Sequence, residues 1–241
     1  MKQTVLTVKE NRALAKSVYI MTLGGDTGAN KPGQFVEIKL DGLYLRRPIS
    51  VCDCENGYLT IIYKVVGSGT EQMTGLKEGD RLDVLTCLGN GYDLAAAGDR
   101  PLLIGGGVGV PPMYLLAKEL IKQGKEVSVI LGFNTRDEVF FEDEFASLGC
   151  SVTVTTADGS YGVRGFVTDA LPDNASYFYA CGPKPMLRAL SERTDIPGEF
   201  SLEERMGCGF GACMGCSVMT KSGAKRVCKD GPVFKKEELI W

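Results

Sequence analysis

The sequence predicts a chain of three parts: an antiparallel β-barrel, an α/β domain with a parallel sheet, and a small cysteine-rich part. Short segments rich in Val, Ile, Thr and Tyr, separated by Gly, Pro, Asn and Asp, fill the first part. Strand-like and helix-like segments then alternate, and four cysteines follow among glycines after residue 207. We expect the three parts to cover residues 1–97, 98–197 and 198–241.

The first part contains six expected strands, at a spacing typical of a small antiparallel barrel or sandwich. Turn residues such as Lys31-Pro-Gly33 and Glu55-Asn-Gly57 separate them. One helix is expected near Thr70–Leu76. The expected strands are Thr4–Lys9, Ser17–Leu23, Gln34–Leu40, Ile49–Asp53, Tyr58–Val66 and Arg81–Leu85.

Three short motifs inside this barrel suit a flat, phosphorylated ligand. The run Leu45-Arg-Arg-Pro-Ile-Ser50 offers a guanidinium, whose planar donors fit a pyrophosphate, and a serine that can hydrogen-bond a ring edge. Tyr63 can lie against a flat cofactor, and Gly69-Thr70 can bring backbone N–H groups to a phosphate. Each motif also has a structural explanation: a solvated strand end, core packing, or a loop.

The second part begins near residues 95–100, where the pattern changes. Strands that alternate with helices imply a parallel sheet covered by helices on both faces, and dinucleotides bind at the carboxyl ends of such strands. The expected strands are Leu102–Ile104, Val127–Phe133, Val152–Thr156 and Tyr177–Ala180, and the expected helices are residues 111–123, Glu138–Leu148, Phe166–Leu171 and Lys184–Arg193.

Two motifs lie at these carboxyl ends. A glycine run from Gly105 to Gly109 separates the first strand from its helix, where helix N–H groups suit a phosphate. It does not match G-x-G-x-x-G cleanly, so a tight strand-to-helix turn is the alternative. Cys181-Gly182-Pro183 follows the fourth strand, and its thiol either packs beside a nicotinamide ring or is an ordinary buried cysteine.

The cysteines of the third part indicate an iron–sulfur cluster. Cys208, Cys213 and Cys216 have the C-x4-C-x2-C spacing of plant-type [2Fe–2S] proteins, and Cys228 follows. Glycines between them let the backbone fold tightly and offer N–H groups to the sulfurs. A structural zinc site or disulfides are the alternatives, but zinc sites usually bring two close pairs, and only Cys213 and Cys216 form one here.

The composition excludes several functions. With 44% apolar and 24% charged residues and a net charge of −3, the chain lacks the basic surplus that nucleic-acid binding requires. No apolar run is long enough to cross a membrane and no signal peptide is evident, so we expect a cytoplasmic protein whose nine cysteines stay reduced or bind metal. The absence of histidine excludes a Ser-His-Asp triad or a His-ligated zinc, so a cofactor rather than a catalytic side chain should carry the chemistry.

The order of these features resembles the ferredoxin–NADP reductase superfamily, in which the barrel binds flavin and the α/β domain binds the nicotinamide cofactor. The runs Ser201-Leu-Glu-Glu-Arg-Met-Gly-Cys208 and Cys228-Lys-Asp-Gly-Pro-Val-Phe234 closely resemble the electron-transfer subunits of B-type, NAD-dependent dihydroorotate dehydrogenase. The resemblance spans essentially the whole chain. One departure is Thr86-Cys-Leu-Gly89, where relatives often have Gly-Pro-Leu-Gly, which leaves the conformation of this loop open.

The resemblance implies three cofactors: FAD, a [2Fe–2S] cluster and NAD. NADH gives up two electrons as hydride, a cluster accepts one at a time, and a flavin can do both, so FAD belongs between them. The implied FAD residues are Arg47, Pro48, Ile49, Ser50, Ile62, Tyr63, Lys64, Gly69 and Thr70. The implied NAD residues are Gly105, Gly106, Gly107, Gly109, Cys181, Gly182 and Pro183, and the implied cluster ligands are Cys208, Cys213, Cys216 and Cys228.

The resemblance also implies a partner. Electrons would come from a separate FMN-containing catalytic subunit that oxidises dihydroorotate in pyrimidine biosynthesis, with two of each chain in a heterotetramer. The base that deprotonates dihydroorotate is then expected in the partner. A reductase of the same architecture that serves a hydrogenase or a ferredoxin-linked transhydrogenase is one alternative, and a zinc-stapled binding protein is another. NAD against NADP stays open, since Arg136 alone makes no arginine cluster for a 2′-phosphate.

Overall fold

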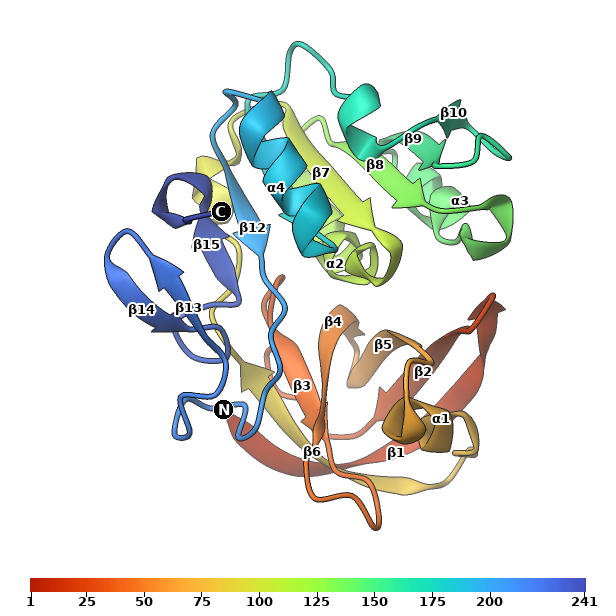
Figure 1. Ribbon diagram of the computed structural model, residues 1–241. Helices are drawn as coiled ribbons and strands as arrows, with labels where there is room; N and C mark the ends of the chain where they lie inside the picture. Colours follow the sequence, from red (N-terminus) through yellow and green to blue (C-terminus); the bar gives the residue numbers. More distant parts are fainter.

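The computed structural model describes residues 1–241, and its first part is a closed barrel of six antiparallel strands (Figure 1). Side chains alternate along a strand, so Leu6 and Val8 of β1 point inward and are fully buried. Of the two predicted alternatives, the barrel is therefore confirmed and the sandwich is not. The short helix α1 spans Ser68–Thr74. In the order of pairing the strands are β1 (Lys2–Ala15), β2 (Val18–Gly24), β5 (Tyr58–Lys64), β4 (Arg47–Glu55), β3 (Phe35–Ile38) and β6 (Arg81–Leu88).

The second part contains a seven-stranded sheet, parallel from β10 to β12 with β15 antiparallel at its edge. Helix α2 (Pro111–Lys122) lies between this sheet and the barrel, and α4 (Lys184–Arg193) covers the other face (Figure 1). The parallel sheet with helices on both faces is therefore confirmed. In the order of pairing the strands are β10 (Val163–Arg164), β9 (Ser151–Thr156), β8 (Ser128–Phe133), β7 (Pro101–Gly106), β11 (Tyr177–Cys181), β12 (Gly198–Ser201) and β15 (Val233–Lys235).

One expected helix is shorter than predicted, and a second is only a 3-10 turn. The segment expected to be helical over Glu138–Leu148 forms a 3-10 turn, η3 (Arg136–Glu138), and then a shorter helix, α3 (Glu142–Ser147). Phe141 separates them with a left-handed backbone, φ 69°, that no helix tolerates, and its ring is buried. The segment Phe166–Leu171 keeps only the 3-10 turn η4 (Val167–Asp169).

The third part is attached to the sheet at both of its ends, because β12 precedes the cysteine loop and β15 follows it. Between them lie the cysteines and the hairpin of β13 (Ser217–Thr220) and β14 (Gly223–Arg226), and the 3-10 turn η5 (Lys236–Glu238) follows β15. The side chain of Asn90, after β6, exchanges hydrogen bonds with the backbone of Val233 at 2.8 and 3.0 Å. No helix in the structure has the length and apolarity needed to cross a membrane.

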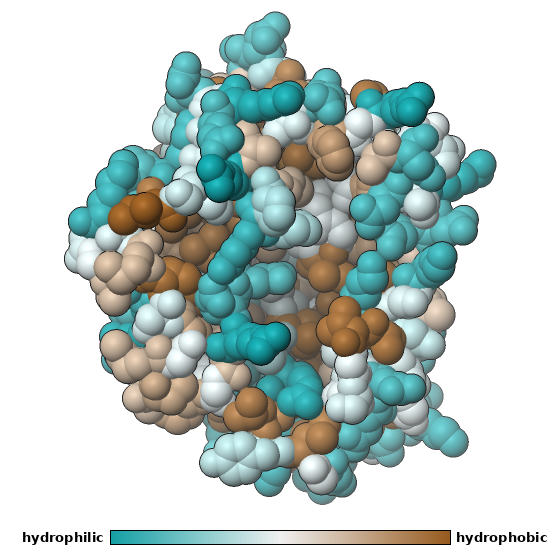
Figure 2. All heavy atoms as spheres, in the orientation of Figure 1, coloured by the Kyte–Doolittle hydropathy of each residue, from teal (hydrophilic) through white to brown (hydrophobic).

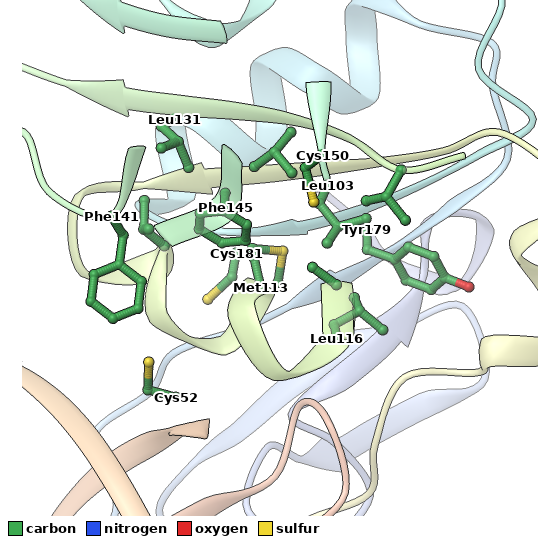
Figure 3. Close-up of a cluster of buried hydrophobic side chains, with 14 of the residues drawn as sticks. Cys52, Leu103, Met113, Leu116, Leu131, Phe141, Phe145, Cys150, Tyr179 and Cys181 are labelled. Atoms are coloured by element: carbon green, nitrogen blue, oxygen red, sulfur yellow. The ribbon is translucent and has the colours of Figure 1, made fainter. Parts of the chain in front are cut away.

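One hydrophobic cluster joins the barrel to the sheet, in addition to the barrel's own interior core. Cys52 of β4 belongs to the same buried cluster as Met113 and Leu116 of α2, and Figure 3 shows these side chains below the sheet strands. Lys118 of α2 adds ion pairs to Asp53 at 2.8 Å and Glu55 at 2.7 Å in the barrel. These contacts hold the barrel and the sheet in one relative position, and with them the cavities that lie between the two parts.

Candidate functional site

Two cavities open in the hollow between barrel and sheet, which Figure 2 shows near the centre of this face. The first, here called the barrel pocket, has a volume of about 360 Å³. It brings together all the residues expected at FAD except Gly69. From the barrel these are Arg47, Pro48, Ile49 and Ser50 of β4, Ile62, Tyr63 and Lys64 of β5, and Thr70 of α1.

The loop before α1 closes one side of the barrel pocket. The Thr70 hydroxyl accepts hydrogen bonds from the backbone N–H groups of Val66 at 2.9 Å and Gly67 at 3.3 Å, which fixes this loop. Gly69 lies directly against the Arg47 guanidinium, where a Cβ would not fit. Gly69 therefore acts by letting the arginine approach, and the pocket itself is lined by its neighbours.

Tyr63 is mainly a core residue, as the structural explanation of its motif anticipates. It is 1% exposed, its hydroxyl donates to Asn11 Oδ1 at 3.0 Å, and its ring stacks on Tyr19 with centroids 5.7 Å apart. Burial raises the pKa of Tyr63 to about 12, so it stays a neutral phenol. Its contribution to the barrel pocket is a fixed apolar wall.

The second cavity, here called the sheet pocket, has a volume of about 650 Å³ and lies at the carboxyl ends of β7, β8, β9 and β11. Of the expected NAD residues it contains Gly106, Gly107, Gly182 and Pro183. A Cβ at Gly106 would lie 2.5 Å from Met186 Sδ, so glycine keeps the wall open there. Residues that sequence reasoning missed complete the lining, among them Asn134, Thr155, Phe166, Met186 and Arg193.

Gly105, Gly109 and Cys181 do not line the sheet pocket. The Cα of Gly105 faces Val110, and that of Gly109 faces the carbonyl group of Cys181, so both glycines allow close packing of the turn. Cys181 is 1% exposed within the core below the sheet (Figure 3), where burial raises the pKa of its thiol. Of the two alternatives for Cys181, the structure therefore supports an ordinary buried cysteine.

Three residues line both pockets: Lys64, Val108 and Glu203. Lys64 Nζ lies 3.0 Å from Glu138 Oε1, and the other oxygen of Glu138 accepts from Asn134 Nδ2 at 2.9 Å. Glu203, just after β12, is exposed and makes no side-chain hydrogen bond or ion pair, and partial desolvation by the surrounding protein raises the pKa of its carboxyl. The junction of the pockets thus holds one paired cation and one free carboxyl group.

The four cysteines of the third part lie as two pairs, Cys208 with Cys213 and Cys216 with Cys228, and not at metal-ligand spacing. Backbone N–H groups point at the sulfurs: Cys208 Sγ accepts from Ala212 at 3.2 Å and Cys213 at 3.4 Å, and Cys216 Sγ accepts from Cys228 at 3.4 Å.

Such donors stabilise thiolates. Burial alone would raise the pKa of Cys208, but the N–H groups of Cys213, Phe210 and Ala212 outweigh it and lower the pKa to about 6. Burial and the neighbouring Cys216 raise the pKa of Cys228 to about 12. Thiols with N–H donors on the sulfurs have the chemistry that a [2Fe–2S] cluster requires, although in this structure the four sulfurs lie as two pairs and would have to converge on the cluster.

A carboxyl group that sequence reasoning missed lies beside the cysteine loop. Glu37 of β3 is 1% exposed, both of its oxygens lack a partner, and burial raises its pKa to about 7. Gly209, with φ 73°, packs directly against this carboxyl group. No sequence pattern points to Glu37, because only the closed barrel brings β3 next to the loop.

Two family models match the chain. Residues 203–240 match the iron–sulfur cluster binding domain of dihydroorotate dehydrogenase B, and residues 103–192 match the oxidoreductase NAD-binding domain. The first match contains all four cysteines, and the second contains the glycine run and Cys181-Gly182-Pro183. Both agree with the order of the expected second and third parts.

Relatives and solved structures agree with these matches. The electron transfer subunit of dihydroorotate dehydrogenase B (NAD(+)) from Geobacillus sp. (strain WCH70) is 46% identical over 100% of this chain and 99% of its own. The subunit of the same name from Fusobacterium nucleatum is 45% identical over 99% of each chain.

Among solved structures, an NADH-dependent reduced ferredoxin-NADP oxidoreductase superposes with a TM-score of 0.90 at 32% identity, over 99% of this chain and 90% of that one. The cytochrome b5 reductase domain of Ulva prolifera nitrate reductase, with a TM-score of 0.64 and 19% identity over 78% of this chain and 89% of that one, shares the fold alone. By its full-length identity to these relatives, the chain belongs to the family of electron transfer subunits of dihydroorotate dehydrogenase B (NAD(+)).

Proposed function

We propose that this chain passes electrons from a dihydroorotate-oxidising subunit through a [2Fe–2S] cluster and FAD to NAD⁺. The residues of the barrel pocket would hold FAD, those of the sheet pocket would hold NAD, and the junction of the pockets would let the nicotinamide meet the flavin. Cys208, Cys213, Cys216 and Cys228 hold the cluster. The three parts, residues 1–97, 98–197 and 198–241, then correspond to the three cofactors.

The observation that carries this proposal is the position of the barrel pocket. It shares Lys64, Val108 and Glu203 with the sheet pocket, and it is also lined by Leu202 and Met206, which lead to Cys208. The barrel pocket therefore adjoins the sheet pocket, and two of its lining residues lie on the segment that leads to the cysteine loop. A flavin in it exchanges hydride with a nicotinamide and single electrons with a cluster, which is the order that the pockets provide.

The residues of the barrel pocket suit FAD. Arg47 supplies the guanidinium for the pyrophosphate, while Pro48 and Ile49 lie on a strand whose direction is fixed by pairing with β3. In the sheet pocket Gly106 and Gly107 open the approach to the turn before α2. The backbone N–H groups of that turn would serve the pyrophosphate, since α2 itself begins with Pro111 and Pro112, which have none. NAD rather than NADP is proposed because the relatives are named for NAD(+).

The relatives are named as electron transfer subunits, which implies a catalytic partner subunit. We infer an FMN-containing subunit, two of each chain, and a cytoplasmic complex. The base that removes a proton from dihydroorotate belongs to that partner.

A second candidate is a reductase of the same architecture with another acceptor. The NADH-dependent reduced ferredoxin-NADP oxidoreductase covers 99% of this chain at 32% identity. Identity of 46% to the dihydroorotate dehydrogenase subunit favours the first candidate. Reduction of this protein by dihydroorotate with its partner, or by ferredoxin without it, separates the two.

The cofactor assignment is tested on the protein purified anaerobically. One FAD and about two irons per chain are expected, and NADH should bleach the flavin absorbance before the electron paramagnetic resonance signal of a reduced cluster rises. A colourless preparation that contains zinc instead of iron would contradict the assignment and support the zinc-stapled binding protein.

A further inference from the structure

Glu37 of β3 carries a buried carboxyl group that has no partner within the barrel. The residue is 1% exposed, and neither side-chain oxygen makes a hydrogen bond. Arg46, the cation that interacts with its charge, is bound elsewhere: the guanidinium donates to the backbone carbonyl of Glu37 at 3.5 Å and to the Asp83 carboxylate at 2.9 Å. Buried polar groups are almost always paired, so we expect a group outside the barrel to serve this carboxyl.

The cysteine loop, between β12 and β13, supplies the backbone that lies against Glu37. Gly209 follows Cys208 directly, adopts φ 73°, and packs on the carboxyl group so closely that a Cβ would not fit. Gly209 is itself buried, and its backbone N–H makes no hydrogen bond in the structure. An unpaired acceptor of the barrel and an unpaired donor of the loop therefore lie side by side.

The charge of Glu37 also reaches an expected cluster ligand. Burial, and after it the charge of Cys208, raise the pKa of Glu37 to about 7, whereas the charge of Arg46 lowers it. A carboxylate and a thiolate at this place are two negative charges that repel each other, and an electron added to a cluster would add a third. Ionised Glu37 is therefore placed to oppose reduction of a cluster that Cys208 holds.

The loop has to move before it can hold a cluster, because the four sulfurs lie as two pairs. Glu37 is fixed by comparison, since β3 pairs with both β4 and β6 and places Glu37 opposite Pro48 and Leu85. A fixed acceptor beside a loop that must converge is the arrangement by which outer-shell groups orient metal ligands. Glycine at position 209 keeps the approach to this acceptor open.

We propose that Glu37 is a positioning residue of the cluster site: its carboxylate accepts the Gly209 N–H when the cluster is bound, and its negative charge opposes reduction of the cluster. The potential of such clusters depends on their net charge and on hydrogen bonds around their sulfurs. The barrel, whose pocket would hold FAD, then also sets the potential of the neighbouring cluster. This inference rests on the proposed function, because it requires the cluster.

The midpoint potential of the cluster is the first test. It is measured near pH 8.5 on the anaerobically purified, cofactor-replete protein, by redox titration followed with electron paramagnetic resonance. Glu37 is ionised there, since its pKa is about 7 and an N–H donor lowers it further. Glu37→Gln keeps the size and one acceptor oxygen but removes the charge, so reduction should become at least tenfold more favourable, a positive shift of about 59 mV for a one-electron couple.

Glu199→Gln is the matched control for this measurement. Glu199 lies on β12 of the sheet and is 4% exposed, and its carboxylate accepts from the Asp93 N–H at 3.0 Å rather than from the cysteine loop. The control removes a buried carboxyl group of the same kind without changing what the loop contacts. It should therefore keep the native potential.

Iron release to a chelator is the second test, and it does not depend on turnover. Glu37→Leu removes both acceptor oxygens and should release iron about tenfold faster or more, since loss of an outer-shell partner weakens metal binding about 10–100-fold. Glu37→Gln, which retains one acceptor, should stay within about threefold of the native rate. Both variants should keep the native FAD content, because Glu37 does not line the barrel pocket.

An unchanged potential in Glu37→Gln would overturn the proposal, as would an equal shift in Glu199→Gln or iron release from Glu37→Leu at the native rate. If Glu37→Gln holds no iron, Glu37→Asp decides, because it keeps both the acceptor and the charge and should hold iron. Loss of iron from Glu37→Asp as well would indicate that the position serves folding alone and would overturn the proposal. Absence of iron from the native protein would instead overturn the proposed function.

Discussion

Replacement of Lys118 by methionine should loosen the contact between α2 and the barrel. The Lys118 side chain is 13% exposed, and its ammonium group contacts Asp53 at 2.8 Å and Glu55 at 2.7 Å. Methionine keeps the aliphatic stem that packs on the barrel, so the change removes mainly the charge. It also leaves the Asp53 carboxylate, 24% exposed, without its cation.

The expected cost lies between two limits. Removing one partner of a fully buried ion pair costs about 3–5 kcal/mol, and exposed pairs contribute about 0.2–1 kcal/mol. Because both groups are mostly but not fully buried, we expect a loss of about 2 kcal/mol. For a chain of this size that corresponds to a fall in melting temperature of about 4–8 °C.

The measurement is thermal unfolding followed by far-ultraviolet circular dichroism. Lys122→Met is the matched control, since Lys122 lies one turn along α2, and its pair with Glu119 is within the helix with the lysine 58% exposed. The control should change the melting temperature by less than about 2 °C. If Lys118→Met falls no further than Lys122→Met, the ion pairs do not hold the two parts together.

Three more predictions concern the cluster and the barrel. Cys213→Ser should remove the cluster and electron delivery to the partner while NADH still bleaches the flavin; loss of bleaching as well would contradict the separation of the two sites. Gly209→Ala should lower the iron content per chain, because φ is 73° and the new methyl would meet the Glu37 carboxyl group; unchanged iron would show that the loop yields. The hydrogen bond from Arg46 lowers the pKa of Asp83, so its stabilisation, about 0.5 kcal/mol, is present at neutral pH and lost as pH falls below about 4. Urea unfolding of Asp83→Asn should therefore differ from the native protein at pH 7 but not near pH 2.

The features of the fold that follow from the spacing of residue types can be predicted from the sequence. Val-, Ile- and Thr-rich strands between turn residues predict the barrel, and alternation of strands with helices predicts the parallel sheet. The barrel motif could also be found, because Arg47 and Ser50 lie on β4 and Lys64 lies on its neighbour β5, two segments that the sequence predicts as strands of one barrel.

Other parts depend on packing that no local pattern encodes. The left-handed Phe141 divides an amphipathic segment, because burying its ring matters more than continuing a helix. Cys181 ends a strand that could present its thiol to either side, and only the packing of α2 below the sheet decides that it is buried. Glu203 lies in the run from Ser201 to Cys208, which the sequence marks only by its resemblance to the family. Its position between the two pockets depends on the path of the chain after β12, which no local pattern encodes.

The central claim is that this chain conducts electrons between dihydroorotate oxidation and NAD⁺. The most direct test is dihydroorotate-dependent reduction of NAD⁺ by the complex recovered anaerobically from native cells through a tag on this chain. Activity is expected, together with an FMN-containing partner subunit in the preparation. A brown complex that holds FAD and the cluster but shows no such activity would contradict the substrate and favour a reductase that serves another acceptor.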